Sequence, residues 1–416
     1  MAPSRKILLI NHFAGSPYHG MEFRPYYLAK EWVQRGHRVT IVAASYSHHR
    51  FNNPILPTNT FIFEEHIDGI RYVWLRTPQY KTSGSSRINN MLSFVRGLFA
   101  YHHQIVGNNK TDVVIASSTY PFDVFPAAYL AHCHQARLVY EIHDLWPEAV
   151  ADVHQLPRWH PYVVSAGVAA QFAYRFTDRI VSILPNVGAF LKRRGVSQDK
   201  IVHVPNGIDP SQWTHRPIDG PFPLIDRITD MQNNGHFVLG YVGTHGAANA
   251  LFQLLDVAEH TQDTNIVYLL VGSGSDKESL KEYARKRRLK NVIFEDPVPK
   301  LDVPGVLAHM DALYIGWRPL RVYQYGISPN KLFDYMASGR PIIHVVNASN
   351  DPVAVAKCGI SVHPNHFARI VEAVRTLAAM PRAQRDTIGQ RGREYVLTHH
   401  IYPVLADTFL KGVFDT

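Results

Sequence analysis

The feature that most constrains the fold is an alternation of short β-branched runs with helical patterns, and it occurs twice along the 416 residues. In the first half, runs such as 6–10 and 39–42 flank segments with helical spacing such as 22–35. The second half repeats the pattern from 238–242 to 342–346. Strands that alternate with helices are typical of β-α-β units. The sequence therefore predicts two α/β domains, each a doubly wound parallel sheet with helices on both faces.

The domain boundaries follow from the same pattern. Pro, Asn, Asp and Gly recur without periodicity over 206–236, which we predict to be a linker between an N-terminal domain, 1–205, and a C-terminal domain, 237–385. The last stretch, 386–416, carries apolar residues at helical spacing, so we expect a helix that docks back on the first domain. Open parallel sheets bind ligands beyond the carboxyl ends of their strands. We therefore expect the loops of the two domains to face a central cleft.

Composition narrows the class of partner. Cys133 and Cys358 belong to no Cys-x-x-Cys or Cys/His cluster, which favours a reducing compartment, the cytosol, and argues against structural zinc. No signal peptide or membrane-spanning helix is expected. The formal charge of +9 suggests an acidic partner: nucleic acid, an anionic membrane surface or a phosphate-bearing substrate. Because no zinc finger or aromatic RNA-binding signature occurs, we do not expect a nucleic-acid partner.

The segment 326–341 is the most informative motif. Ser328 is a good N-cap and Pro329 suits the first helical position, so the free N–H groups of the first turn, with Lys331 beside them, predict an anion site. Asp334 lies four residues after Asn330 on the same helix face and offers a carboxylate to sugar hydroxyls. A nucleotide sugar needs both groups. An ordinary capped amphipathic helix is the alternative that this segment alone leaves open.

Three further loops follow predicted strands. The small residues of 243–249, and of 272–276, would let backbone N–H groups approach a phosphate, although for the second loop a plain strand-to-helix turn is as good an interpretation. The loop 15–20 resembles a loose phosphate loop but lacks a Walker lysine, which disfavours ATP hydrolysis. His143, beside Asp144 at a strand end, is better placed for a ligand than for the core.

No Asp-x-Asp sequence and no His/Glu metal spacing occurs in the chain. We therefore expect no metal and no cofactor. Charge that develops on a departing diphosphate would then be stabilised by Lys331, by Arg318 and by backbone N–H groups at helix starts.

These residues jointly resemble retaining glycosyltransferases of the GT-B fold, family four, over essentially the whole chain. The residues 204–209 are similar to the inter-domain signature of that family, 271–274 to the turn of its second domain, and 334–341 to the end of its Glu-x7-Glu element. The residues 20–25, 143–147 and 326–331 are similar to a bacterial subgroup that resembles fucosamine transferases of surface-polysaccharide assembly, such as O-antigen synthesis.

The resemblance assigns roles to residues. It implies that Asp334 holds the donor ribose, that Val298 lies where backbone groups receive the uracil, and that His143 lines the donor-sugar site. Two departures stand out. Gly326 occupies the first glutamate position, so that the loop with Arg318, Tyr323 and Tyr325 is the candidate replacement. Thr244, His245 and Asn249 replace the Arg and Lys pair of the family, which leaves more of the phosphate binding to Lys331.

The sequence thus predicts a metal-independent retaining hexosyl- or acetamidohexosyltransferase. It would move a sugar, such as a deoxy or acetamido sugar, from a UDP-sugar to a lipid-linked or saccharide acceptor. The resemblance implies that the departing phosphate deprotonates the incoming hydroxyl. His143 would then position and polarise the reacting groups at the donor-sugar site. A nucleotide-sugar 2-epimerase and a non-catalytic sugar-nucleotide-binding scaffold are the alternatives.

The predicted site falls into three groups. His143 and Lys331 are the predicted catalytic residues. The predicted donor-binding residues are Gly15, Ser16, Gly243, Thr244, His245, Asn249, Gly272, Val298, Arg318, Gly326, Ile327, Ser328, Asn330, Lys331 and Asp334. The predicted acceptor-side residues are Tyr18, Glu22, Arg24 and Asp144.

Two segments of the first domain, 88–101 and 156–176, combine aromatic side chains with arginines. Each taken singly is expected to be a core helix. A lipid-linked acceptor would nevertheless require the first domain to approach an anionic inner leaflet. We therefore expect a cytoplasmic protein with peripheral contact to an anionic membrane at the inner face of the plasma membrane.

Overall fold

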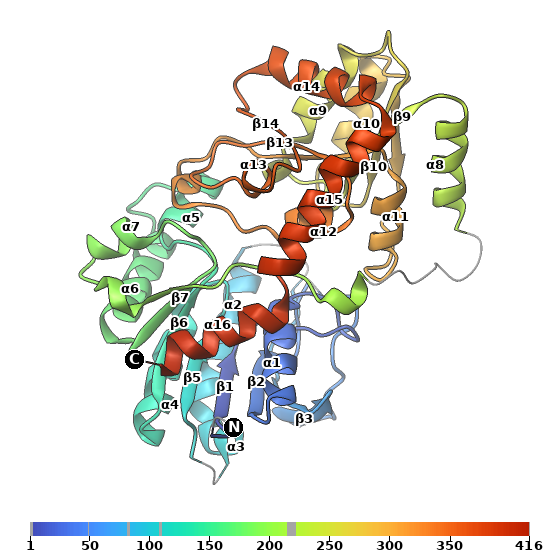
Figure 1. Ribbon diagram of the computed structural model, residues 1–416. Coiled ribbons are helices and arrows are strands. Elements are labelled where there is room, and N and C mark those ends of the chain that lie inside the picture. The colour runs from blue at the N-terminus through green and yellow to red at the C-terminus, as the bar shows by residue number, and fades with distance from the viewer. Residues whose placement is uncertain (1–2, 49, 81–83, 108–109, 214–221, 416) are drawn as a thin grey trace. The chain divides into compact units, whose positions relative to one another are not determined.

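The computed structural model describes residues 3–48, 50–80, 84–107, 110–213 and 222–415, and Figure 1 shows its elements. The chain forms two compact units. The first comprises Met1–Pro205 together with Tyr402–Thr416, and the second comprises Asn206–Ile401. Each unit contains one sheet and its own apolar core, so each is described by itself.

The first unit is built on an eight-stranded sheet with the order β3-β4-β2-β1-β5-β6-β7-β8. The strands are β1 (Lys6–Ile10), β2 (Arg38–Ala44), β3 (Ile62–Ile67), β4 (Ile70–Leu75), β5 (Val113–Ala116), β6 (Arg137–Ile142), β7 (Arg179–Ser182) and β8 (Ile201–His203). All neighbours are parallel except β3 and β4, which form an antiparallel hairpin at the edge. The turn of this hairpin is Asp68-Gly69, both at positive φ, the signature of a two-residue hairpin loop.

The strand order explains which helices share a face of this sheet. The chain steps from β1 to β2 in one direction and from β4 through β5 and β6 to β7 in the other, so right-handed crossovers place the connecting helices on opposite faces. One face carries α1 (Arg24–Gln34) and α16 (Tyr402–Phe414), whose Trp32 and Phe409 rings meet at 5.1 Å. The other carries α2 (Ser85–Ala100), α3 (His102–Val106), α4 (Val124–His134) and α6 (Pro161–Phe176). Two short helices, α5 (Glu148–His154) and α7 (Gly188–Lys192), complete the unit.

The second unit has a six-stranded sheet with the order β11-β10-β9-β12-β13-β14, parallel throughout. Its strands are β9 (Phe237–Val242), β10 (Ile266–Val271), β11 (Val292–Glu295), β12 (Ala312–Gly316), β13 (Ile342–Val345) and β14 (Gly359–Val362). Its helices are α8 (Pro223–Asn233), α9 (Leu251–Glu259), α10 (Lys277–Lys286), α11 (Val303–His309), α12 (Asn330–Ala337), α13 (Pro352–Ala356), α14 (Phe367–Ala379) and α15 (Arg382–His399). Apolar side chains fill both faces of the sheet, so the predicted doubly wound α/β architecture is confirmed.

Two segments differ in detail from the sequence-based expectation. The region 206–236 contains helix α8, which starts at Pro223 and buries Ile228, while its residues 214–221 lie outside the described residues. The C-terminal segment from 386 is not one helix. Its first part belongs to α15 of the second unit, and the helix that packs on the first unit is α16, which begins at Tyr402 with Pro403 in its first turn, where proline is tolerated.

Candidate functional site

In the second unit, the loops at the carboxyl ends of the strands converge on the start of α12. The helix begins at Asn330 with Pro329 as its N-cap. Ser328 was expected to be the cap, and this is wrong. Its hydroxyl accepts a hydrogen bond from the Asn206 backbone N–H at 2.8 Å, and its carbonyl accepts one from the Asn206 side chain at 2.6 Å. Ser328 therefore anchors this loop to the segment that opens the second unit, and the first N–H groups of α12 receive no side-chain cap.

Lys331 lies in the first turn of α12 and is held by neutral groups. Its Nζ donates to Tyr241 Oη at 2.5 Å and to Asn249 Oδ1 at 2.9 Å, and it lies 4.3 Å from the centre of the Tyr241 ring. Burial lowers the pKa of Lys331 to about 7, against a smaller opposing effect of Asp334. The described structure pairs no carboxylate with this amine within salt-bridge distance. The site is thus prepared for an anion from outside the chain.

Two glycines make room for this arrangement. A Cβ on Gly243 would lie 2.5 Å from Lys331 Cε, and the φ of Gly243 is +151°. A Cβ on Gly272 would lie 2.0 Å from the carbonyl oxygen of Gly243. The loops after β9 and β10 therefore touch each other backbone to backbone, and Lys331 lies against the first of them.

His245 lies inside the same loop and is fully buried. Neither ring nitrogen meets a hydrogen-bond partner among the described residues. Burial, together with the positive charges of Lys277 and Lys331, lowers the pKa of His245 to about 4. The imidazole is therefore neutral at physiological pH and supplies no cation to the site.

Asp334, one turn further along α12, is paired. Its Oδ2 accepts a hydrogen bond from Lys300 Nζ at 2.6 Å, and both side chains are partly exposed. Lys300 follows Val298 in the loop after β11, and Val298 packs against the apolar core at its inner side. The pairing fixes the direction of the Asp334 carboxylate and brings the Val298 loop beside α12.

The remaining predicted donor residues lie around this core of the site. Ile327 is buried, and its backbone exchanges two hydrogen bonds with the side chain of Asn350. Gly326 precedes it at a φ of 102°. Arg318, Thr244 and Asn330 are exposed. Asn249 Nδ2 donates to the Thr244 carbonyl at 2.9 Å, so that its Oδ1 is directed to Lys331.

The first unit gathers a second group of polar residues at the carboxyl ends of β1, β5 and β6. Glu141, at the end of β6, is 1% exposed and accepts two hydrogen bonds from Arg24, at 3.0 and 2.8 Å. Its other oxygen accepts from Ser117 Oγ at 2.6 Å and lies 3.4 Å from His143 Nε2. Burial opposes the charge of Glu141, but Arg24 and His143 lower its pKa.

Burial alone would lower the pKa of His143, but the Glu141 carboxylate outweighs it and raises that pKa. Ser117 Oγ also lies 3.2 Å from His143 Nε2. This nitrogen therefore faces Glu141 and Ser117, and the interaction orients the ring. The His143 side chain is 8% exposed, so only a small part of it faces solvent.

The loop after β1 is closed on itself. The Gly15 N–H donates to the Glu22 carbonyl at 2.9 Å, and a Cβ on Gly15 would lie 1.8 Å from the Gly20 carbonyl oxygen. Ser16 Oγ lies 2.8 Å from His19 Nδ1. Within this closed loop, the ring of Tyr18 is exposed to solvent. Glu22, which follows the loop, has a carboxyl whose pKa is raised by burial.

Of the predicted acceptor-side residues, Asp144 is exposed while Arg24 is buried. Besides Glu141, the guanidinium of Arg24 donates to the carbonyls of Pro205 and Val204, at 2.6 and 2.9 Å. Sequence reasoning did not assign Glu141, Ser117, Tyr241 or Lys300 to the site. Only Glu141 carried a signal, as a carboxylate in an apolar strand two residues before His143.

No group of three or more His, Cys, Asp or Glu side chains arranged to hold a metal ion occurs among the residues that the structure describes. Within the same ranges, the helices are all too short or too polar to cross a bilayer.

Comparison with known proteins identifies both units. Residues 18–212 match the family Glycosyltransferase Family 4, and residues 236–380 match Glycosyl transferases group 1. A curated relative, the putative colanic acid biosynthesis glycosyl transferase WcaI of Escherichia coli (strain K12), is 21% identical over 343 residues, covering 79% of this chain and 81% of its own.

Solved structures of two other proteins are similar in fold to this chain. The sucrose-phosphate synthase of Thermosynechococcus elongatus gives a TM-score of 0.73 at 16% identity, with 98% of both chains covered. The structure of Anabaena Alr3699/HepE in complex with UDP and glucose gives a TM-score of 0.67 at 14% identity, again with 98% of both chains covered. The chain therefore has the GT-B fold and carries both of these glycosyltransferase domains.

Proposed function

We propose that this chain, a glycosyltransferase of GT-B fold, transfers a hexosyl or acetamidohexosyl residue from a UDP-sugar to a lipid-linked or saccharide acceptor, with retention of anomeric configuration and without a metal ion. Its place would be in the synthesis of a cell-surface polysaccharide. The observation that carries the proposal is the Lys331 amine at the start of α12. Tyr241 and Asn249 hold it, and among the described residues no carboxylate pairs with it and no side chain caps the helix.

A diphosphate would complete this arrangement. Two negative charges at the start of α12 would meet the free N–H groups of its first turn and the Lys331 amine. The same charges would raise the pKa of Lys331 and keep it protonated. Because the departing group of the reaction is a nucleoside diphosphate, Lys331 would stabilise the charge that develops as the bond between the sugar C1 and the phosphate oxygen breaks.

We assign the nucleoside to the neighbouring loops. Asp334, paired with Lys300, would accept hydrogen bonds from ribose hydroxyls, and the backbone at Val298 would receive the base. Uracil is favoured by the resemblance of the sequence to UDP-dependent transferases and by the complex of HepE with UDP and glucose. The name of WcaI, which concerns colanic acid biosynthesis, supports a role in polysaccharide synthesis.

We assign positioning of the acceptor and of the donor sugar to the first unit. His143, oriented by Glu141 and Ser117, would donate a hydrogen bond to the donor sugar. The buried Arg24 acts on it through Glu141 and is a positioning residue. The acceptor hydroxyl would form the new bond to C1 while its proton passes to the departing phosphate oxygen, so that no protein base is required.

The test is turnover of a panel of UDP-hexoses and UDP-acetamidohexoses with polyprenyl-diphosphate-linked and free saccharide acceptors. Release of UDP and an axial or equatorial anomeric proton that matches the donor would support the proposal. Formation of a 2-epimer without acceptor would instead indicate an epimerase. Binding of UDP-sugars with no turnover on any acceptor would indicate a non-catalytic scaffold.

A further inference from the structure

The helix layer formed by α2, α3, α4 and α6 exposes large apolar side chains to solvent, and we call its outer surface the outer helix face. The indole of Trp159, just before α6, is 78% exposed. The other exposed members are Ile88, Leu92 and Phe99 on α2, Tyr129 on α4, and Val164, Val168 and Phe176 on α6. Each helix also buries an apolar side against the sheet, so these residues are additional to the core.

The apolar side chains form a continuous strip. On α6, Val164, Val168, Phe172 and Phe176 follow one another at intervals of four residues, which places them on one side of the helix. The Phe172 ring lies 5.0 Å from Phe125 of α4 and 4.7 Å from Phe176. Phe99 of α2 lies 5.8 Å from Tyr129 of α4. A contiguous exposed apolar surface is uncommon on soluble proteins, and where it occurs it usually marks an interaction site.

The charge on this face has one sign. The helices α2, α3, α4 and α6 contain no Asp or Glu. Exposed cations are present, however: Arg96 on α2, Arg175 on α6, and Arg158 and Lys110 in adjoining loops. The opposite face of the same sheet differs, because Glu31 of α1 and Asp407 of α16 are both paired there with Arg35.

Three carboxylates that lie near this layer in sequence have partners in the first unit. Asp112 accepts a hydrogen bond from the Lys6 backbone N–H at 2.7 Å, and Asp178 accepts one from the Leu138 N–H at 2.7 Å. Glu148 of α5 pairs with Arg194 at 2.5 Å. These three carboxylates thus have partners, although Asp178 itself is exposed, and the exposed charged side chains on the four helices are all cations.

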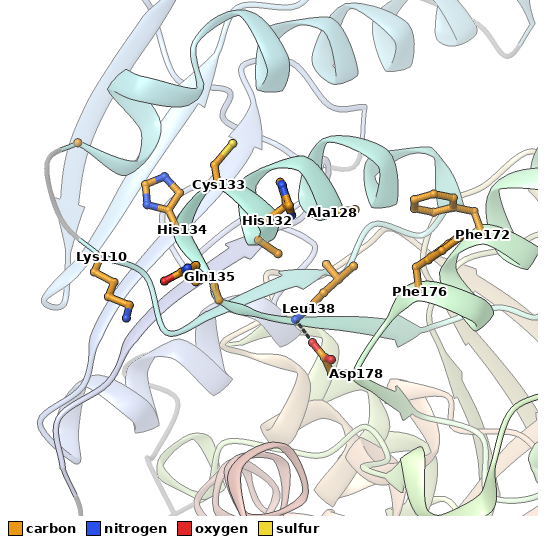
Figure 2. Close-up of a pocket in the computed structure, with 13 residues that line it drawn as sticks. Lys110, Ala128, His132, Cys133, His134, Gln135, Leu138, Phe172, Phe176 and Asp178 are labelled. Carbon is orange, nitrogen blue, oxygen red and sulfur yellow. Dashed lines mark hydrogen bonds between the residues drawn. The ribbon is translucent and has the colours of Figure 1, made fainter.

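A hollow of about 1360 Å³ opens at the end of this face, beside the amino ends of β6 and β7. Figure 2 shows Phe172 and Phe176 on one side of it, with Lys110, His132 and His134 toward the other. Its lining combines these apolar rings and Leu138 with Lys110, two histidines and one carboxylate, Asp178. None of the residues that we assign to donor binding lines it.

We infer that the outer helix face is the surface by which this protein lies on an anionic lipid bilayer. Aromatic and aliphatic side chains would enter the headgroup region, while Arg96, Arg158 and Arg175 would meet lipid phosphates. A second copy of the chain is a poorer occupant, because a two-fold interface would bring these cations against each other. The inference rests on the proposed function only in that a lipid-linked acceptor is presented by the same bilayer.

The test is flotation of the full chain with vesicles of phosphatidylcholine, with and without phosphatidylglycerol. We expect the protein to float with the anionic vesicles only and to dissociate as salt is raised. Each cation near the surface contributes about a fivefold change in partition. The partition of the double variant Arg158→Glu/Arg175→Glu onto anionic vesicles should therefore fall by more than about twentyfold, and Val168→Glu should also bind these vesicles weakly.

Matched controls are available elsewhere on the chain. Lys286→Glu/Arg382→Glu makes the same charge change at exposed sites of the second unit, and Ile55→Glu introduces a carboxylate at an exposed aliphatic position of the first. Both should bind vesicles like the parent. A second readout uses the parent fold: brominated lipid should quench tryptophan emission in the parent and markedly less in Trp159→Phe.

The outcomes separate this inference from the proposed function. Equal flotation of parent and face variants, or no binding to anionic vesicles at any salt, would overturn the inference. A stable dimer that Val168→Glu disperses, without vesicle binding, would also overturn it in favour of a second copy. A thermal response to UDP-sugars in the same preparations reports on the donor site, so that either proposal can fail while the other stands.

Discussion

Lys331 should make the affinity for a UDP-sugar depend on pH, with a sign that the structure fixes. Its pKa is about 7 in the free protein because the amine is buried among neutral partners. About half of the amines are then protonated at pH 7 and about one in a hundred at pH 9. A bound diphosphate raises this pKa, so binding above pH 7 requires uptake of a proton.

The magnitude follows from that linkage. Affinity should be constant below about pH 6 and fall about tenfold per pH unit above pH 7, which amounts to about 100-fold, or about 2.7 kcal/mol, by pH 9. The diphosphate of a UDP-sugar is a diester and does not itself titrate in this range. Stability of the free protein should change in the opposite sense. Unfolded lysine binds protons up to about pH 10.4, so the Lys331 contribution to the free energy of unfolding should increase from pH 7 to 10.

Isothermal titration of a UDP-sugar between pH 6 and 9, in two buffers of different ionisation enthalpy, measures both affinity and proton uptake. Lys331→Met should bind weakly with a flat profile. Asn249→Asp would place a carboxylate beside the Lys331 amine and raise its pKa. The fall in UDP-sugar affinity should then move to higher pH, and the affinity below pH 7 should be lower than in the parent. Equal slopes in the parent and Lys331→Met, or no proton uptake at pH 8–9, would refute the reasoning.

Other variants test separate parts of the site. Asp334→Ala should weaken UDP-sugar binding by about 1.5–3 kcal/mol, because charge-assisted hydrogen bonds to the ribose are lost; unchanged affinity by calorimetry would remove Asp334 from the donor site. Glu141→Gln removes the charge that raises the pKa of His143 and so favours its protonated, hydrogen-bond-donating form; kcat should therefore fall, and the basic limb of its pH profile should move to lower pH while the donor KM stays near the parent value. A parent-like profile would argue against the pairing. Excess EDTA should leave turnover intact, and a loss that Mg²⁺ or Mn²⁺ restores would contradict a metal-independent mechanism.

The architecture was predictable because buried parallel strands read as short apolar runs between helical patterns. The edge hairpin was harder. β3, with the sequence Ile-Phe-Glu-Glu-His-Ile, neither alternates strictly nor forms an apolar run, since most of it is partly or fully exposed. Helix α8 was hidden in a turn-rich segment and buries only Ile228. The sequence predicted a C-terminal helix that docks back on the first domain, but it placed the start of that helix at 386, whereas the chain changes units at Tyr402.

Within the site, local patterns located residues better than they located partners. The sequence placed Lys331 and Asp334 at a helix start after a strand, and the structure places them there. Lys300, which pairs with Asp334, lies 34 residues earlier on a different loop, and no local spacing connects the two. The hydrogen bond from Arg24 to Glu141 likewise joins residues that lie 117 positions apart in the sequence. Ser328 looked like a cap because its residue type suits one, but a long-range bond to Asn206 holds it instead.

The central claim is that the second unit binds a UDP-sugar through Lys331. A thermal-shift panel of UDP-, GDP- and TDP-sugars on the parent and on Lys331→Met tests it most directly. We predict that UDP-sugars stabilise the parent, by about 2.7 kcal/mol at a hundredfold excess over Kd, and that the response largely disappears in Lys331→Met. No shift with any UDP-sugar, or an equal shift in both proteins, would contradict the claim.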